Sequence, residues 1–200
     1  MSFKRFGAVI LAAFLLLPIS AQALTNAATT SSYASYNKAS AREYVIKFGE
    51  EHHLGNNDSW KVYAAPALNA VRGANGKASV HSSGGMDSAG WSGAWLLVRY
   101  EKNNGGFRVG WIPKTELNMR TIQATRSVNF AYWTVALAEN CALTDDPLLE
   151  SETLAYAAKG EQMTYLAYYR YKNGAEYAYV QSELDGRPVC GFVPFDAIDW

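Results

Sequence analysis

The sequence predicts an all-β protein built from two similar units, and three observations lead to this fold class. Of the 200 residues, 49% are hydrophobic, 14% are aromatic and only 18% are charged, which is too apolar for a disordered chain. Short runs of aromatic and aliphatic residues alternate with glycine- and asparagine-rich turns. The chain also matches itself when it is displaced so that Gly110 falls on Gly191. Units of about 60 residues are too small for a two-sheet sandwich, so each is expected to form a small, strongly bent barrel.

Residues 1–23 read as a secretory signal peptide. Lys4 and Arg5 precede an unbroken apolar run, Ala8–Leu17, and Ala21-Gln22-Ala23 supplies the small-x-small cleavage pattern. The alternative is an uncleaved anchor, but the apolar run is much shorter than the roughly 20 residues of a membrane span. We therefore predict cleavage, no membrane contact of the mature chain, and a secreted, extracellular or cell-surface location.

Residues 24–59 are predicted to be a flexible N-terminal segment. The part from 24 to 40 consists mainly of Ser, Thr, Ala and Asn, a composition typical of tethers. Further on, Ser40–Glu43 fits a capping box that opens a short helix, whereas Glu43–Phe48 fits a strand equally well. The sequence does not decide between these two interpretations.

An internal repeat organises the rest of the chain. The clearest match places Gly110-Trp111-Ile112-Pro113 on Gly191-Phe192-Val193-Pro194, and we call this displacement the repeat offset. Other matches are Pro66 with Pro147, Leu117 with Ile198 and, after adjustment by a single position, Trp95–Val98 with Tyr177–Val180. Matches that keep a common spacing rarely arise by chance, so we predict a first repeat at 60–118, a linker at 119–138 and a second repeat at 139–200.

Each repeat is predicted to contain a hairpin, because two apolar runs flank a turn-forming pair or quartet of residues. The predicted strands and turns are Trp95–Tyr100, Asn103–Gly106 and Phe107–Ile112 in the first repeat, and Tyr177–Gln181, Asp185-Gly186 and Val189–Val193 in the second. Further turns of the first repeat are expected at Asn75-Gly76 and Ser83–Gly85.

A strand, turn and strand ending in Gly-aromatic-aliphatic-Pro resembles the SH3-like barrels, and in particular the bacterial SH3b domain. The opening segment Val62–Pro66 and the run Trp95–Tyr100 are also similar to SH3b strands, so the resemblance covers both repeats and most of the mature chain. It implies two tandem SH3-like barrels in an extracellular, non-catalytic protein that recognises cell-wall peptide or an anionic wall polymer. The alternative function is a protein–protein interaction module, or an inhibitor of another secreted protein.

The resemblance also implies a ligand site. Side chains alternate along a strand, so Trp111 and Pro113 share one face while Ile112 points into the core. In SH3 domains the matching aromatic and proline line the peptide groove. The other reading of these aromatics is an ordinary core role. The candidate ligand-binding residues are Trp111 and Pro113, their counterparts Phe192 and Pro194, Tyr63 on the opening strand, and Trp91 in a glycine-flanked segment expected to be a loop.

The two cysteines are predicted to form a disulfide. The repeat offset places Cys141 on Trp60 and Cys190 on Val109, at the opening and closing strands of a repeat. If these strands are neighbours, a bridge between Cys141 and Cys190 replaces a Trp–Val contact, and secretion permits it. The alternative, a catalytic thiol paired with a histidine, is disfavoured because the second repeat contains no histidine.

Net charge hides an asymmetry between the repeats. The first repeat carries a charge of +4 and the second a charge of −7. The first repeat is therefore suited to attract an anionic polymer, although the opposite charges equally suit packing of the repeats on each other or a solvated surface. Nucleic acid is excluded as a partner, since the mature net charge is negative and no Lys/Arg run exists.

Catalytic and metal-binding patterns are missing from the sequence. The chain has three His and two Cys, without Cys-x-x-Cys or His-x-x-x-His spacing. No serine, histidine and carboxylate motif indicates a triad, and no glycine-rich segment has the setting of a phosphate loop. We predict that the protein is not an enzyme and needs neither a metal nor a cofactor.

Overall fold

The computed structural model describes residues 36–52, 58–81, 85–102, 106–120, 122–148 and 153–200, all within the unit Ala34–Trp200. The predicted signal peptide, residues 24–35 of the predicted flexible segment and most of the predicted turns at 83–85 and 103–106 lie outside the described residues.

Strands account for most of the regular structure. In chain order they are β1 (Glu50–His52), β2 (Ser59–Lys61), β3 (Ser79–His81), β4 (Met86–Ser92), β5 (Trp95–Glu101), β6 (Phe107–Pro113), β7 (Trp133–Leu137), β8 (Cys141–Thr144), β9 (Thr153–Ala157), β10 (Gln162–Arg170), β11 (Glu176–Leu184), β12 (Arg187–Pro194) and β13 (Ile198–Asp199). The helical segments in the described ranges are α1 (Lys38–Ala41) and two single 3₁₀ turns, η1 (Lys114–Glu116) and η2 (Phe195–Ala197).

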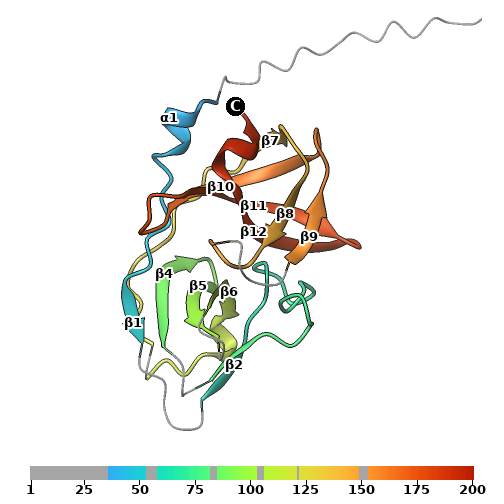
Figure 1. Ribbon diagram of the computed structural model, residues 1–200. Helices are drawn as coiled ribbons and strands as arrows, with labels where there is room; N and C mark the ends of the chain where they lie inside the picture. The colour runs from blue at the N-terminus through green and yellow to red at the C-terminus, as the bar shows by residue number, and fades with distance from the viewer. Residues whose placement is uncertain (1–35, 53–57, 82–84, 103–105, 121, 149–152) are drawn as a thin grey trace, which may run out of the picture. The chain divides into compact units, whose positions relative to one another are not determined.

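The described residues form three antiparallel sheets, with strand orders β1-β4-β5-β6, β13-β7-β10-β11-β12-β8-β9 and β2-β3 (Figure 1). The all-β fold class is thereby confirmed. No sheet among the described residues closes into a barrel, so the finer prediction of two SH3-like barrels stays a prediction. No helix in the described part of the chain is both long and apolar enough to span a bilayer.

The two sequence repeats also share a pattern of strand pairing. Tyr63 lies opposite Trp111 in the first repeat, and Thr144 lies opposite Phe192 in the second, so both partners are related by the repeat offset. Each repeat also carries a bulge in the strand that pairs with the first strand of its predicted hairpin, between Ser88 and Gly90 in β4 and between Tyr165 and Ala167 in β10. The same register and the same irregularity therefore occur twice in the chain.

The glycine of the Gly-x-x-Pro motif is required for the same structural reason in both repeats. A Cβ atom on Gly110 would lie 2.9 Å from the carbonyl oxygen of Tyr63, and one on Gly191 would lie 2.7 Å from that of Thr144. Real Cβ atoms do not approach a backbone oxygen this closely. Glycine is therefore required where the closing strand crosses the opening strand.

The N-terminal strap, defined as residues 36–52, packs on both repeats. It begins with α1, whose cap is Asn37 rather than Ser40, and Ala41 is completely buried. Val45 bridges to Tyr168 of the second repeat, and β1 then pairs with β4 of the first. Figure 1 shows this strap, in blue, running past β10 down to β4. Neither sequence interpretation of 43–48 describes it, because α1 ends before this stretch and β1 begins after it.

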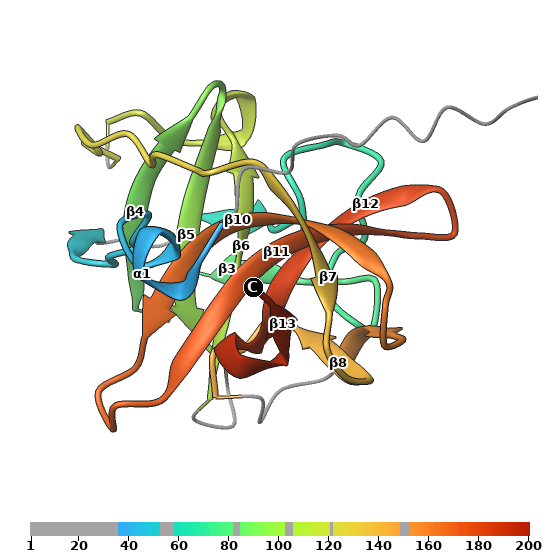
Figure 2. The same cartoon turned by 90° about the horizontal axis from the view of Figure 1, so that it is seen from above.

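The predicted linker is also part of the packed structure. Its last residues form β7, which joins the seven-stranded sheet between β13 and β10. Ser127 bridges to Trp91, and Phe130 is buried against residues of both repeats. In Figure 2 this segment, in yellow, passes over β4 and β5 and reaches β7. The packed structure of the second repeat therefore includes residues that precede the predicted boundary at 139.

Glu50 ties the strap to the linker. Its Oε1 accepts hydrogen bonds from the Thr125 backbone N–H at 3.2 Å, the Thr125 hydroxyl at 3.0 Å and the Arg126 backbone N–H at 3.3 Å. Its Oε2 accepts one from the Ser88 hydroxyl at 3.2 Å. Burial raises the pKa of Glu50, but hydrogen bonds from Thr125, Ser88 and Arg126 lower it, and the net pKa lies below the ordinary value of 4.5.

Glu50→Gln is expected to make the free energy of unfolding less dependent on pH under acidic conditions. A carboxylate whose pKa is lowered on folding adds stability above its unfolded-state pKa, and this stability is lost as the pH falls through the lower folded-state pKa. Wild type should therefore lose free energy of unfolding below about pH 5 more steeply than the variant. Urea unfolding between pH 7 and pH 3 measures the difference, with Glu51→Gln on the exposed side of β1 as the control. Equal slopes for Glu50→Gln and wild type would contradict the role given to Glu50.

Candidate functional site

The faces predicted to bind a ligand pack against each other. Trp111 of the first repeat is 1% exposed and Phe192 of the second is 0% exposed. The Trp111 Nε1–H donates to the hydroxyl of Tyr179 at 2.9 Å, a contact between the repeats. We call the buried apolar cluster around them the shared core. Its members are Ile46, Tyr63, Ala65, Ala70, Ala89, Leu97, Val109, Trp111, Phe130, Leu166, Ala167, Tyr169, Tyr177, Tyr179, Cys190 and Phe192.

Two backbone hydrogen bonds make this packing reciprocal. The Val109 N–H donates to the Asp145 carbonyl at 2.6 Å, and the Cys190 N–H donates to the Ala64 carbonyl at 2.9 Å. The repeat offset places Val109 on Cys190 and Ala64 on Asp145, so the same two positions bond each other in both directions. This is the pattern of an isologous interface, in which one patch meets its own copy. The repeats are thus joined as an internal pseudo-dimer.

A buried ion pair crosses the same interface. Arg108 Nε lies 2.6 Å from Asp145 Oδ2, and their side chains are only 10% and 2% exposed. Arg108 belongs to the positive repeat and Asp145 to the negative one. Nearby, burial raises the pKa of Tyr100, an effect that Arg108 opposes and Asp145 reinforces. The pair is a contact of the kind expected if opposite charges help the repeats to pack.

The other predicted ligand residues are spread around the interface. Tyr63 and Pro113 are buried, and the ring of Tyr63 packs edge-on against Trp95, with ring centroids 5.6 Å apart. Pro194 is half-buried. Trp91 is half-buried too, but it lies in β4 rather than in a loop. Its Nε1–H donates to the Ala124 carbonyl at 2.9 Å.

The structure therefore brings Tyr63, Trp111 and Phe192 together in the shared core and leaves Trp91 apart from them. In this arrangement the three aromatics touch protein and not solvent. Ile112 lies in the separate core of the first repeat, as its alternation with Trp111 predicts. The ligand-binding role of the six residues stays a prediction.

The predicted disulfide is wrong, because Cys141 and Cys190 are both free thiols. β8 and β12 are neighbours, but they pair at Thr144 and Phe192. In an antiparallel pair this register puts Cys190 opposite Asp146, five positions from Cys141. Five positions along a strand are roughly 16 Å, well beyond the reach of a disulfide.

Thiol titration is expected to find two free cysteines in the denatured, unreduced protein. In the native protein Cys190 should not react, because it is buried in the shared core and burial raises the pKa of its thiol. The half-buried Cys141 should react slowly, since burial and the nearby Glu139 and Glu161 raise its pKa. A chromogenic thiol reagent counts both with and without denaturant. Zero thiols after denaturation would restore the disulfide.

One further constellation was missed by the sequence analysis. The His52 Nε2 lies 2.8 Å from the Ser88 hydroxyl, which donates to Glu50 Oε2 at 3.2 Å. The residue types are those of a catalytic triad, but the carboxylate bonds the serine rather than orienting the histidine. Ser88 is 0% exposed, so no substrate reaches its oxygen. The three residues instead fasten β1 to β4.

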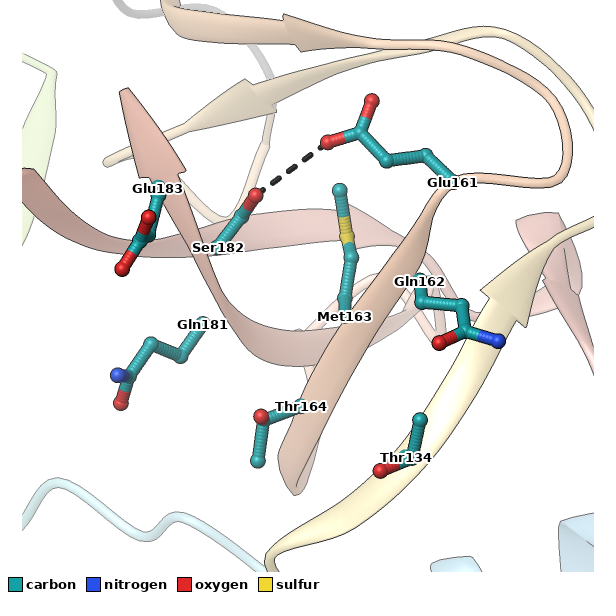
Figure 3. Close-up of a pocket in the computed structure, with 8 residues that line it drawn as sticks. All are labelled: Thr134, Glu161, Gln162, Met163, Thr164, Gln181, Ser182 and Glu183. Carbon is teal, nitrogen blue, oxygen red and sulfur yellow. Dashed lines mark hydrogen bonds between the residues drawn. The ribbon is translucent and has the colours of Figure 1, made fainter. Parts of the chain in front are cut away.

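A polar depression opens where the seven-stranded sheet divides (Figure 3). Thr164 pairs with Gln181, and beyond this pair β10 continues along β7 while β11 continues along β12. The volume between the separating strands is about 450 Å³. The depression is lined by Thr134, Glu161, Gln162, Met163, Thr164, Gln181, Ser182 and Glu183.

A second cavity lies between the two repeats and is lined by both. We call it the arginine cleft, and its volume is about 430 Å³. Arg72 Nε and Nη2 donate to the Ala78 carbonyl at 3.3 Å and 2.9 Å, which fixes this guanidinium, while Arg187 is exposed. The lining residues are Leu68, Asn69, Ala70, Val71, Arg72, Gly73, Ala74 and Gly76 of the first repeat, and Leu154, Leu184 and Arg187 of the second.

Among the residues that the structure describes, no group of three or more His, Cys, Asp or Glu side chains is placed to hold a metal ion. The arrangement instead offers cavities with hydrogen-bonding or charged linings and a central interface that joins the repeats. Comparison of the chain with protein-family models, with curated proteins and with solved structures found no match.

Proposed function

We propose that the protein is a secreted, non-catalytic binding protein of two SH3-like units that recognises cell-wall peptide or an anionic wall polymer in the arginine cleft. The single observation that carries the proposal is this cleft between the repeats, whose lining combines two arginines with aliphatic side chains. The cleft needs both repeats, and this requirement gives a reason for their union in one chain.

The lining of the cleft suits an anionic group attached to an apolar body. A guanidinium has five N–H donors, and the two bonds to Ala78 use only two of those of Arg72. Arginine forks match carboxylate and phosphate oxygens, the anions of a peptide terminus and of a wall polymer. Leu68, which is 70% exposed, and Leu184 offer contact to aliphatic side chains of a ligand.

This proposal assigns the SH3-type aromatics a different task from the one that the resemblance implies. Trp111 and Phe192 are buried in the shared core, so the ligand contacts a surface that their packing creates. A ligand of the cleft touches neither of them. The binding site and the packing interface can therefore be tested separately.

Cosedimentation of the mature chain, residues 24–200, with purified peptidoglycan tests the proposal. Wild type is expected to pellet, and Arg187→Gln to pellet at least tenfold less, because the exposed Arg187 lines the cleft. Arg120→Gln removes an equally exposed charge outside the cleft and should leave binding unchanged.

Three outcomes of this assay are informative. Loss of pelleting at high salt would indicate that charge dominates binding. Binding only to walls that retain anionic polymer would identify phosphate rather than carboxylate as the ligand group. No pelleting of wild type would overturn wall recognition, and a discrete complex in a pull-down from secreted proteins would then favour the interaction-module alternative.

A further inference from the structure

Part of the lining of the depression lies on the same face of β11 as the shared core. Tyr179, two residues before Gln181 on β11, belongs to the shared core, and side chains two residues apart share a face. None of the described residues that line the depression belongs to the first repeat. The face therefore continues from a buried aromatic region into an open polar one.

Three neighbouring strands supply a row of hydrogen-bonding side chains across the depression. Thr164 is paired with Thr134 on one side and with Gln181 on the other, so the three side chains stand next to each other. Gln162 and Glu183 extend the row, each two residues further along its strand. Figure 3 shows these five side chains around the mouth of the depression.

The floor of the depression differs from its rim. Met163, only 4% exposed, comes from the core side of β10 and fills the gap between the separating strands. Beside it, Glu161 is held in place because its Oε1 accepts a hydrogen bond from Ser182 at 3.3 Å and its Oε2 accepts one from the Ala158 N–H at 3.0 Å. The depression is therefore lined by polar side chains, and its apolar lining residue, Met163, is almost completely buried.

We propose that this depression binds a neutral saccharide. Amide and hydroxyl side chains both donate and accept, which matches the alternating donors and acceptors of sugar hydroxyl groups. Among the described residues no Lys or Arg lines the depression, and Glu161 and Glu183 do, so an anion is repelled. The volume lies within the range of small-ligand pockets.

The saccharide site does not rest on the arginine cleft. The two cavities share no lining residue among those described, and their chemistry is opposite, because one presents guanidinium groups and the other carboxylates and neutral groups. Arg187→Gln is therefore expected to leave saccharide binding unchanged. Failure of one proposal leaves the other standing.

Titration of the isotope-labelled mature chain with an N-acetylglucosamine tetramer, followed by amide NMR, tests the inference. Shifts are expected at Thr134, Thr164 and Gln181. Gln181→Ala and the isosteric Thr164→Val should each weaken affinity about tenfold, the equivalent of one hydrogen bond in this setting. Gln123→Ala, at an exposed position in the predicted linker, is the matched control.

The result that would overturn the inference is an unchanged spectrum of wild type at millimolar tetramer. Unchanged affinity in a Thr164→Val protein with a native spectrum would overturn it as well. A lysine-rich peptide that shifts Glu161 and Glu183, where the tetramer shifts nothing, would assign the depression to cationic ligands instead. Tenfold weakening by both variants, with the control unaffected, would support the saccharide site.

Discussion

Trp111→Ala is expected to lower the free energy of unfolding by about 3–5 kcal/mol, the range for truncating a large buried aromatic. The side chain is 1% exposed and contacts both repeats through the shared core. The substitution also leaves the Tyr179 hydroxyl without its indole donor. A loss of this size is a large share of the stability of an ordinary domain.

Urea unfolding followed by circular dichroism measures this effect. Because the shared core joins the repeats, the loss should appear in one transition of the whole molecule. Trp111→Phe should retain more than half of the free energy of unfolding that Trp111→Ala loses. Trp91→Ala, at a half-buried indole of β4 that packs against the separate core of the first repeat, serves as the comparison and should cost less. A Trp111→Ala protein of wild-type stability that no longer pellets with peptidoglycan would instead restore the SH3-type groove predicted from the resemblance.

Asp145→Ala is the second substitution with a large expected effect. It leaves Arg108, with a side chain only 10% exposed, without its carboxylate in the interface. Breaking a buried ion pair by removing one partner typically costs about 3–5 kcal/mol, chiefly through the uncompensated charge. The same urea experiment measures the loss, and Asp185→Asn in the exposed turn before β12 is the control, because asparagine also tolerates the φ of 50° at this position.

The double variant Arg108→Met, Asp145→Leu tests whether the ion pair stabilises the interface more than apolar side chains of similar size would. Replacing both ions with apolar side chains of similar size removes the desolvation cost together with the attraction, so most of the lost stability should return. A double variant as unstable as Asp145→Ala would show that the ion pair itself stabilises the interface. With either result, the effects of the single variants Arg108→Met and Asp145→Leu should be strongly non-additive.

The strands were predictable because their signals are local. Alternation placed Ile112 in the core of the first repeat, and the glycines of the Gly-x-x-Pro motif marked the crossing of the closing strand. The repeat offset predicted two units of the same kind, and the pairing of Tyr63 with Trp111 is repeated by that of Thr144 with Phe192. These features depend on periodicity and on turn chemistry, both of which a single sequence carries.

The interface was not predictable in the same way. A groove that binds a peptide and a face that binds the other repeat call for the same aromatic and proline pattern, so Trp111 fits both. The disulfide failed for a related reason, since two strands can be neighbours while their register keeps two cysteines five positions apart. The start of the strap was missed because the composition of residues 24–40 resembles a tether, whereas Ala41, directly after it, is buried by contacts distant in sequence.

The reciprocal interface allows the two halves to diverge. In a dimer of identical chains each substitution appears twice, so an ion pair across the symmetry axis must be matched by a second one. Here the positions equivalent to Arg108 and Asp145 are Val189 and Ala64. An ion pair therefore joins the repeats at one of the two equivalent places in the interface, and apolar residues occupy the other. Covalent linkage keeps the local concentration of the partner high whatever these residues are. A duplicated gene can thus retain the symmetric backbone contacts while its side chains evolve independently.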